Sequence, residues 1–419
     1  MARSRKSAFS ITAERTFTRC FLPDQQGGRP LRVALVTSSY NFIADGVALT
    51  LNRLVAYLEA QGVEVVVFTP VAKVAAFKHA GRVAPVPSIP APFRAEYRLA
   101  VGLTGGPRRL LKAFRPDIIH IAVPDLLGAE ALAVGQGLGV PVVASYHTRF
   151  ETYLKDYGLG FAHDWLVARI KRIYGACDEL YAPSASMIEA LLAEGFAPNI
   201  HLWQRGVDTE RFNPAKRTAD FRTRHGIGTD EKVIAFVGRL VREKRLDVVS
   251  DVAARLTAAG IAYRMLFVGE GPDRAALEKR LPGAVFTGFL GGEDLAAAYA
   301  SSDIFFFPSD TESFGNVTLE AMASGLPTVC ADATGSRSLV IDGTTGFLAP
   351  PGDGAAAFEA VARLLADNGL RATLGAAARA RSLEFSWDET MAGLLARYRA
   401  LVRVRQAQVQ AAAWGLHPS

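Results

Sequence analysis

The chain has 419 residues, 50% of them apolar and 21% charged, a globular balance in a length that favours two domains over one. Its three cysteines lie far apart without a C-x-x-C pair, which argues against a zinc site and for a reducing compartment. No apolar run approaches the ~20 residues of a membrane-spanning helix.

Charge is unevenly distributed. Residues 1–215 hold 24 Lys and Arg against 18 Asp and Glu, whereas residues 216–419 hold 23 of each, so the net +6 lies entirely in the first half. Residues 1–28 are basic and lack the apolar stretch of a signal peptide, so we expect a separate N-terminal extension. The asymmetry fits either an anionic partner for the first half or simple solubility.

In chain order, short apolar runs alternate with amphipathic segments. A helix is predicted over residues 45–62 and another over 316–325. Continuously apolar strands are predicted in two series, first at 31–39, 63–70, 117–122, 141–147 and 179–184, then at 232–238, 263–271, 284–289, 303–309, 327–332 and 346–350.

Two such series predict an α/β protein with two Rossmann-like domains facing each other across a cleft. We expect an N-terminal domain over 29–212 and a C-terminal domain over 213–385, because the pattern lapses into charged residues and Pro214 between them. The last helix, within 386–408, has no strand after it and is expected to pack back on the first domain. Ligands of parallel sheets bind beyond the carboxyl ends of the strands, so the residues that follow each strand are the candidates.

In the second series, Gly238 ends a strand and is followed by Arg239 and Lys244. A guanidinium fork and an ammonium five residues apart suit a diphosphate, although a solvated basic loop is the plainer alternative. The next strand leads into Gly269-x-Gly271, which lacks the third glycine of a dinucleotide fingerprint. These glycines allow either a close nucleotide approach or an ordinary strand-to-helix turn.

The stretch "SDTESFGNVTLEAMASG" places Glu312 in a turn and Glu320 one turn inside an apolar helix. The first backbone N–H groups of a helix lack intrahelical partners, so this end suits hydroxyls or an anion. A carboxylate costs several kcal/mol to bury without a partner. The two glutamates therefore favour a polyhydroxylated ligand over exposed turn and helix positions.

These motifs, together with "SYHTRF" and "RGVDTERFNP", resemble those of retaining glycosyltransferases of family 4, which have the GT-B fold. The resemblance covers the chain after residue 28 and is closest to bacterial enzymes that glycosylate lipids or lipid-linked acceptors. It departs at Gly335 and Ser338, where many relatives have paired glycines and a glutamate.

The resemblance implies a role for each matching residue. Glu320 would hold the ribose of a nucleotide sugar, and Glu312 the hexose hydroxyls. Further donor contacts would come from Gly46, Gly238, Gly269 and the backbone of Phe314, Gly315 and Asn316. Arg239 and Lys244 would stabilise the leaving diphosphate without a metal or other cofactor, and the sequence contains no D-x-D motif. The catalytic set would be His147, Arg239, Lys244 and Glu312, with acceptor candidates Asp45, His147 and Arg149.

The implied reaction moves a hexosyl or hexuronosyl group from a nucleotide diphosphate sugar to an acceptor hydroxyl. We expect a membrane lipid such as diacylglycerol or ceramide as the acceptor, with no nucleic acid partner. The basic, apolar segments 105–117 and 163–178 suit peripheral contact with anionic lipid at the inner face of the cytoplasmic membrane, or are ordinary core-facing helices. A soluble or polyprenyl-linked glycan acceptor, an NDP-sugar epimerase and a non-catalytic binder are the alternatives.

Overall fold

The structure, a computed structural model, describes residues 29–43, 45–91, 94–147, 163–196 and 199–414. From Leu31 onward the chain forms one compact unit. The predicted extension over residues 1–28 and the acceptor candidate Arg149 lie outside the described residues.

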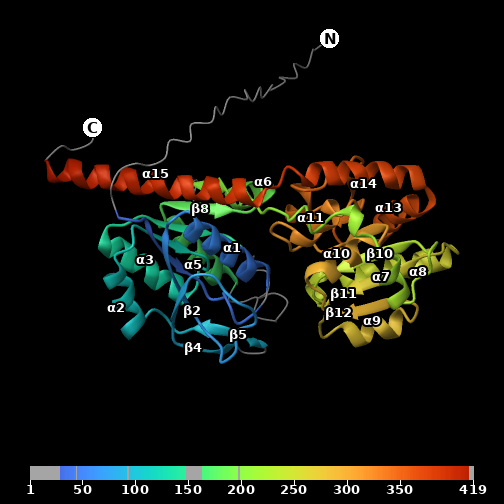
Figure 1. Ribbon diagram of the computed structural model, residues 1–419, viewed down its shortest axis with the longest axis horizontal. Helices are drawn as coiled ribbons and strands as arrows, with labels where there is room; N and C mark the ends of the chain where they lie inside the picture. Colours follow the sequence, from blue (N-terminus) through green and yellow to red (C-terminus); the bar gives the residue numbers. More distant parts are fainter. Residues whose placement is uncertain (1–28, 44, 92–93, 148–162, 197–198, 415–419) are drawn as a thin grey trace, which may run out of the picture. The chain divides into compact units, whose positions relative to one another are not determined.

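The first half forms a seven-stranded parallel sheet with strand order β3-β2-β1-β6-β7-β8-β9, which with its helices we call the N-lobe (Figure 1). Its strands are β1 (Arg32–Val36), β2 (Glu64–Thr69), β3 (Arg82–Pro85), β6 (Ile118–Ile121), β7 (Val142–Ser145), β8 (Glu179–Ala182) and β9 (Ile200–Leu202). Its helices are α1 (Gly46–Ala60), α2 (Gly105–Phe114), α3 (Leu126–Leu138), α5 (His163–Gly175) and α6 (Ala185–Ala193).

The second half forms a six-stranded parallel sheet with strand order β12-β11-β10-β13-β14-β15, the C-lobe. Its strands are β10 (Val233–Val237), β11 (Arg264–Val268), β12 (Val285–Gly288), β13 (Ile304–Phe307), β14 (Thr328–Ala331) and β15 (Gly346–Ala349). Its helical elements are η2 (Pro214–Lys216), α7 (Ala219–Arg224), η3 (Arg242–Lys244), α8 (Leu246–Ala258), α9 (Arg274–Arg280), α10 (Gly292–Ala300), α11 (Asn316–Ala323), α12 (Thr334–Arg337), α13 (Gly354–Ala366) and α14 (Asn368–Ser382).

The strands form where the sequence is continuously apolar because both faces of each sheet are covered by helices. Every residue of β10 and β13 is buried, and the phenylalanines of these strands pack against one another in the C-lobe core. The predicted α/β class with two Rossmann-like sheets is therefore confirmed. The domain boundary at residues 212 and 213 stays a prediction.

Four of the strands in the described part of the chain were not predicted from the sequence. Two are edge strands of the N-lobe sheet, β3 and β9, and two form an antiparallel hairpin, β4 (Ser88–Ala91) and β5 (Arg94–Ala100). These segments contain proline, arginine or only three residues, so they lack the apolar run that identifies a central strand.

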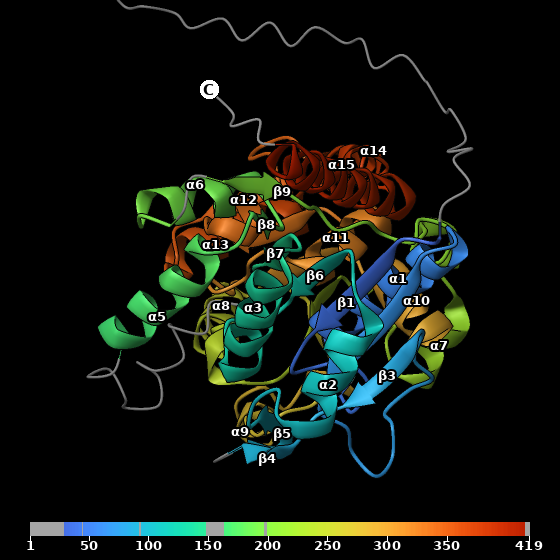
Figure 2. The same ribbon diagram turned by 90° about the vertical axis from the view of Figure 1, so that its left-hand side faces the viewer.

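Helix α15 (Trp387–Ala413) leaves the C-lobe and packs on the N-lobe, as expected. Met391, Leu394 and Leu395 join the N-lobe core cluster that also contains residues of α1. Arg397 donates to both carboxylate oxygens of Glu179 in β8, at 2.9 and 2.6 Å. Figures 1 and 2 show α15 lying over β8. The C-terminal helix thus ties the end of the chain to the first lobe.

Candidate functional site

The loop between β13 and α11 holds the first predicted glutamate. Glu312 forms an ion pair with Lys244 of η3 and accepts a hydrogen bond of 3.0 Å from Ser309 Oγ. Both charged side chains are about one-fifth exposed, so the pair is largely shielded from solvent but still accessible to it. The structure therefore brings together the acid and the cation that the sequence placed 68 residues apart.

The amino-terminal end of α11 is shaped by a glycine. Gly315 caps the helix with φ 94°, a left-handed conformation that strains other residues, while the Phe314 ring is buried against Phe385. The side-chain oxygen of Asn316 is buried and accepts no hydrogen bond from the described residues. This helix end therefore offers unpaired backbone donors and an unsatisfied amide oxygen, a suitable set for hydroxyl groups.

Glu320 lies one turn further along α11 and is half-buried. Its carboxylate accepts a hydrogen bond of 3.0 Å from Tyr299 Oη in α10. Burial raises the pKa of Glu320 to about 7, while the Tyr299 hydrogen bond and the positive charges of Arg211 and Arg53 oppose that rise. Arg53 belongs to α1, so a positive charge of the N-lobe acts on this carboxylate of the C-lobe.

Gly269, which follows β11, packs closely against the backbone of Gly238, which follows β10. A methyl group on Gly269 would lie 2.0 Å from the carbonyl oxygen of Gly238, and Gly269 has φ 138°. Arg239, which follows Gly238, is exposed and acts electrostatically on Asp45. The structure thus puts Arg239 near the start of α1, while the donor role of the glycines stays a prediction.

The start of α1 lies next to the start of α11. A methyl group on Gly46 would come within 3.2 Å of Asn316 Nδ2. Asp45 caps α1 by accepting from Ala48 N at 2.8 Å, and it also accepts from Ser39 Oγ at 3.1 Å. Asp45 therefore has a local structural function, capping, that sequence reasoning did not assign to it; its role toward an acceptor stays a prediction.

His147 follows β7 and is buried, with both ring nitrogens occupied. Nδ1 lies 2.7 Å from Arg205 Nη2, and Nε2 lies 2.8 Å from Ser145 Oγ. Burial, and then the charge of Arg205, hold the pKa of His147 well below its usual range. The imidazole is neutral and engaged in the N-lobe interior, and its predicted catalytic role is untested.

A series of hydroxyl groups joins the two lobes beside this site, and sequence reasoning missed it. Ser313 donates to the carbonyl oxygen of His147 at 2.6 Å, and Ser184 donates to the carbonyl oxygen of Ser313 at 3.0 Å. Ser186 and Ser338 share a hydrogen bond of 2.7 Å between α6 and the end of α12. Ser338, the position of a family departure, thus contributes to the contact between lobes. Isolated serines carry no sequence signal for such a role.

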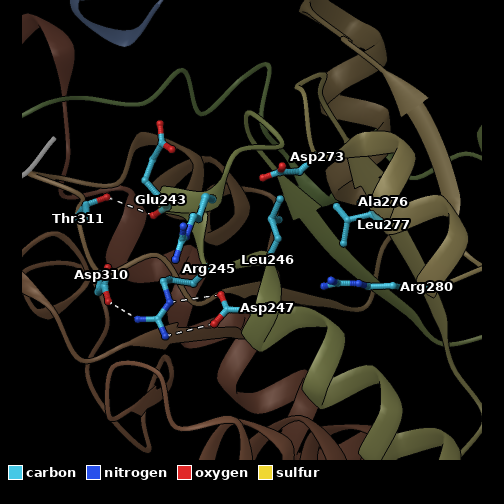
Figure 3. Close-up of a pocket in the computed structure, with 11 residues that line it drawn as sticks. Glu243, Arg245, Leu246, Asp247, Asp273, Ala276, Leu277, Arg280, Asp310 and Thr311 are labelled. Atoms are coloured by element: carbon cyan, nitrogen blue, oxygen red, sulfur yellow. Dashed lines mark hydrogen bonds and ion pairs between the residues drawn. The ribbon is translucent and has the colours of Figure 1, made fainter. Parts of the chain in front are cut away.

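A cavity of about 590 Å³ lies beside these loops, on the C-lobe surface between η3, α8 and α9 (Figure 3). Its lining includes Glu243, Arg245 and Asp310, neighbours in sequence of Lys244 and Glu312, which do not themselves line it. Figure 3 shows Arg245 held between Asp310 and Asp247, and the Arg245–Asp310 contact measures 2.7 Å. Because neither Lys244 nor Glu312 lines it, this cavity is a neighbour of the predicted site and not the site itself.

Comparison with known proteins identifies the family. Residues 44–211 match the family described as Glycosyltransferase Family 4, and residues 218–381 match Glycosyl transferases group 1. The chain belongs to this glycosyltransferase family. It is 35% identical over 395 residues to sulfoquinovosyl transferase SQD2 of Arabidopsis thaliana, covering 92% of this chain and 75% of that protein. It is 37% identical over 388 residues to a GDP-mannose-dependent alpha-mannosyltransferase of Mycobacterium tuberculosis, covering 90% and 99%.

Solved structures show the same fold. Sucrose-phosphate synthase of Thermosynechococcus elongatus superimposes with a TM-score of 0.72 at 23% identity, covering 89% of this chain and 100% of that one. Anabaena HepE in complex with UDP and glucose gives a TM-score of 0.69 at 19% identity, covering 88% and 99%. The GT-B fold and the enzyme class expected for this glycosyltransferase are therefore confirmed.

The raised pKa of Glu320 predicts an unusual pH dependence of stability. A carboxyl whose folded pKa of about 7 lies above its ordinary 4.5 stabilises the fold while protonated and loses that contribution as pH rises through this window. Glu320→Gln should therefore raise the free energy of unfolding at pH 8 by about 1–3 kcal/mol and change it little near pH 4. Chemical denaturation at both pH values measures this, with exposed Glu359→Gln as the control. Equal effects of both substitutions on the free energy of unfolding at pH 8 would contradict a raised pKa of Glu320.

Proposed function

We propose that this enzyme transfers a hexosyl or hexuronosyl group from a nucleotide diphosphate sugar to the hydroxyl of a membrane lipid such as diacylglycerol or ceramide. The observation that carries the proposal is the amino-terminal end of α11, where the Asn316 side-chain oxygen has no partner among the described residues and the preceding loop carries Glu312 in its ion pair with Lys244. Oxygen acceptors and a cation beside free backbone donors match a sugar joined to a phosphate. The donors named for the relatives, a sulfoquinovosyl group and GDP-mannose, support a hexose-type donor.

In this proposal Glu320 accepts hydrogen bonds from the ribose hydroxyls, and Glu312 and Asn316 accept them from the hexose. The acceptor oxygen forms a bond to the anomeric carbon on the face from which the diphosphate departs, so the configuration is retained. The bond between the anomeric carbon and the phosphate oxygen breaks, and the departing phosphate takes the proton of the acceptor hydroxyl. This route needs no protein nucleophile.

Arg239 and Lys244 stabilise the negative charge that develops on the departing diphosphate. The two cations sit on the β10–η3 segment of the C-lobe, and Lys244 already lies within reach of Glu312. Because this charge stabilisation comes from side chains, the proposed reaction uses no metal cofactor.

We expect that EDTA leaves the rate of transfer unchanged, whereas Lys244→Met lowers kcat roughly 10²–10³-fold, the usual cost of losing one preorganised charge partner. The readout is release of nucleoside diphosphate, with exposed Lys279→Met in α9 as the matched control. A rate that collapses in EDTA and recovers with Mg²⁺ would refute metal independence.

The N-lobe offers a surface suited to a lipid bilayer. The hairpin β4–β5 exposes Ile89 and Leu99, each about half accessible, and the chain then continues into α2, whose Arg108 and Arg109 are exposed. Figures 1 and 2 both show α2 and this hairpin at one end of the N-lobe. Apolar and basic side chains together favour peripheral binding to anionic lipid.

Helix α5 is a weaker candidate for this contact than the sequence suggested. Trp165 is 67% exposed, but Tyr174 is buried in the core and Lys171 lies over the Phe196 ring. Among the described residues, no helix is both long and apolar enough to pass through a bilayer. The exposed basic and apolar side chains of α2 and the β4–β5 hairpin favour surface contact, and we propose the inner face of the cytoplasmic membrane as the working location.

Reversing charge on α2 tests the membrane contact. Arg108→Glu with Arg109→Glu should lower binding to phosphatidylglycerol-containing vesicles by about tenfold or more, since each cation near the surface contributes about 1 kcal/mol. Vesicle flotation measures the bound fraction, and Lys279→Glu with Arg280→Glu is the control with an identical charge change on the C-lobe. Equal loss in both variants would indicate a net-charge effect and refute a docking face.

The reaction itself is tested by mass spectrometry of products after incubation with a panel of nucleotide sugars and mixed lipid vesicles. We expect a hexosylated lipid with the wild-type protein and its loss with Glu320→Ala. Release of nucleoside diphosphate without a glycolipid would overturn the lipid acceptor and point to a soluble or polyprenyl-linked glycan. Conversion of the donor alone into an isomeric nucleotide sugar would identify an epimerase.

A further inference from the structure

A buried arginine, Arg205, lies behind the candidate site. Arg205 follows β9 and is 5% exposed. Its Nη1 donates to the carbonyl oxygen of Trp203 at 3.2 Å, its Nη2 donates to His147 Nδ1, and its guanidinium lies 4.6 Å from the centre of the Trp203 ring. Across the part of the chain that the structure describes, no carboxylate forms an ion pair with it, and burial lowers its pKa to about 9. Burying a charged guanidinium without an ion pair costs free energy of folding, and a function that depends on this residue would account for that cost.

The guanidinium is the fixed end of a chain of buried hydrogen bonds. Beyond His147, Ser145 Oγ lies 2.8 Å from both His147 Nε2 and His120 Nε2, and His120 Nδ1 contacts the Tyr398 hydroxyl. His120, Ser145 and Tyr398 are fully buried. The chain therefore links the end of β9 through β7 and β6 to helix α15.

Because a guanidinium can only donate, it sets the direction of the whole chain. His147 Nδ1 must accept from Arg205, so the ring proton sits on Nε2 and is donated to Ser145 Oγ. The serine proton then points to His120 Nε2, and His120 Nδ1–H is donated to the Tyr398 oxygen. One residue thus selects the tautomers of two histidines.

We propose that Arg205 is a positioning residue, which fixes the tautomer and ring orientation of His147 and thereby holds the N-lobe side of the candidate site. The link to the site is the His147 carbonyl oxygen, which accepts from Ser313 Oγ at 2.6 Å immediately before Phe314 and Gly315. A rotated or protonated His147 would disturb this link and the loop that leads into α11. Arg205 thus acts on the donor-binding loop without contacting it.

The charges around His147 predict what removal of Arg205 does. The titratable groups that act on the imidazole are Arg205 and His120, both of which lower its pKa, and behind His120 lie Tyr181 and Tyr398. Without Arg205, burial still opposes the imidazolium, but the strongest charge that opposes it is gone and Nδ1 is left without a donor. His147 then gains protons at a higher pH than in the wild-type protein.

The first test needs no substrate. In wild-type protein with ring-¹⁵N-labelled histidine, assigned with His147→Gln, we expect the Nε2–H tautomer of His147 and no titration between about pH 5.5 and 8, where an ordinary histidine titrates. In Arg205→Met, His147 should change tautomer or begin to titrate, whereas exposed Arg403→Met should change neither. An Nδ1–H tautomer in the wild-type protein overturns the proposal even if Arg205→Met fails to fold.

The second test rests on the proposed glycosyl transfer and uses kinetics. Arg205→Met should lower kcat about tenfold or more and add an acidic limb, a loss of rate towards low pH, beyond any that the wild-type enzyme shows. The double variant Arg205→Met/His147→Gln should be no slower than His147→Gln and should lack that limb. If the losses in kcat of the two single variants add up in the double variant, Arg205 does not act through His147 and the proposal is overturned. A wrong acceptor would abolish the kinetic signal in every variant but leave the histidine spectra intact, so the two failures are distinguishable.

Discussion

Two helix amino termini meet at the candidate site, and this arrangement constrains everything around it. The start of α1 at Gly46 lies against Asn316 at the start of α11, close enough that a methyl group would crowd the amide. Each helix end carries roughly half a positive charge, and Arg239 and Lys244 add to it. Such a concentration of positive charge is stable only with anions nearby. Within the chain, Asp45 at the start of α1 and Glu312 beside Lys244 supply part of the negative charge that compensates it. A diphosphate would supply more.

The carboxylates of the site are adapted to this field in different ways. Glu312 is paired with Lys244, so its charge is compensated directly. Among the described residues, Glu320 is compensated by the Tyr299 hydroxyl and by more distant arginines, and burial raises its pKa to about 7. A poorly compensated carboxylate is a cost to folding that ligand hydroxyls can offset, so its position is understandable in a binding site and not in a core.

Behind the site, as at Glu320, a charged side chain is buried without a partner of opposite charge in the described part of the chain. Arg205 is buried and forms no ion pair with a carboxylate among the described residues, and the chain from His147 to Tyr398 satisfies its polar atoms one by one across β7, β6 and α15. Buried networks of this kind are rigid because breaking one bond leaves a desolvated group unpaired. The C-terminal helix therefore contributes both apolar packing and the last hydroxyl of the network. Its return to the N-lobe secures the lobe that carries His147.

The sequence alone determined the α/β class, the central strands and the family, because continuous apolar runs and motifs such as that of Glu312 and Glu320 are local features of the chain. It also identified α15 as the returning helix, since no strand follows it. The edge strands β3 and β9 of the N-lobe and the β4–β5 hairpin were not predicted, because these short segments have no distinctive apolar period. Only the tertiary structure revealed that Arg205 faces His147, that Asp45 caps α1 and that Ser313 bridges the lobes. The Arg205–His147 and Ser313–His147 contacts join residues distant in sequence, whereas the Asp45 cap is a local contact, and burial in three dimensions decides which charges are compensated.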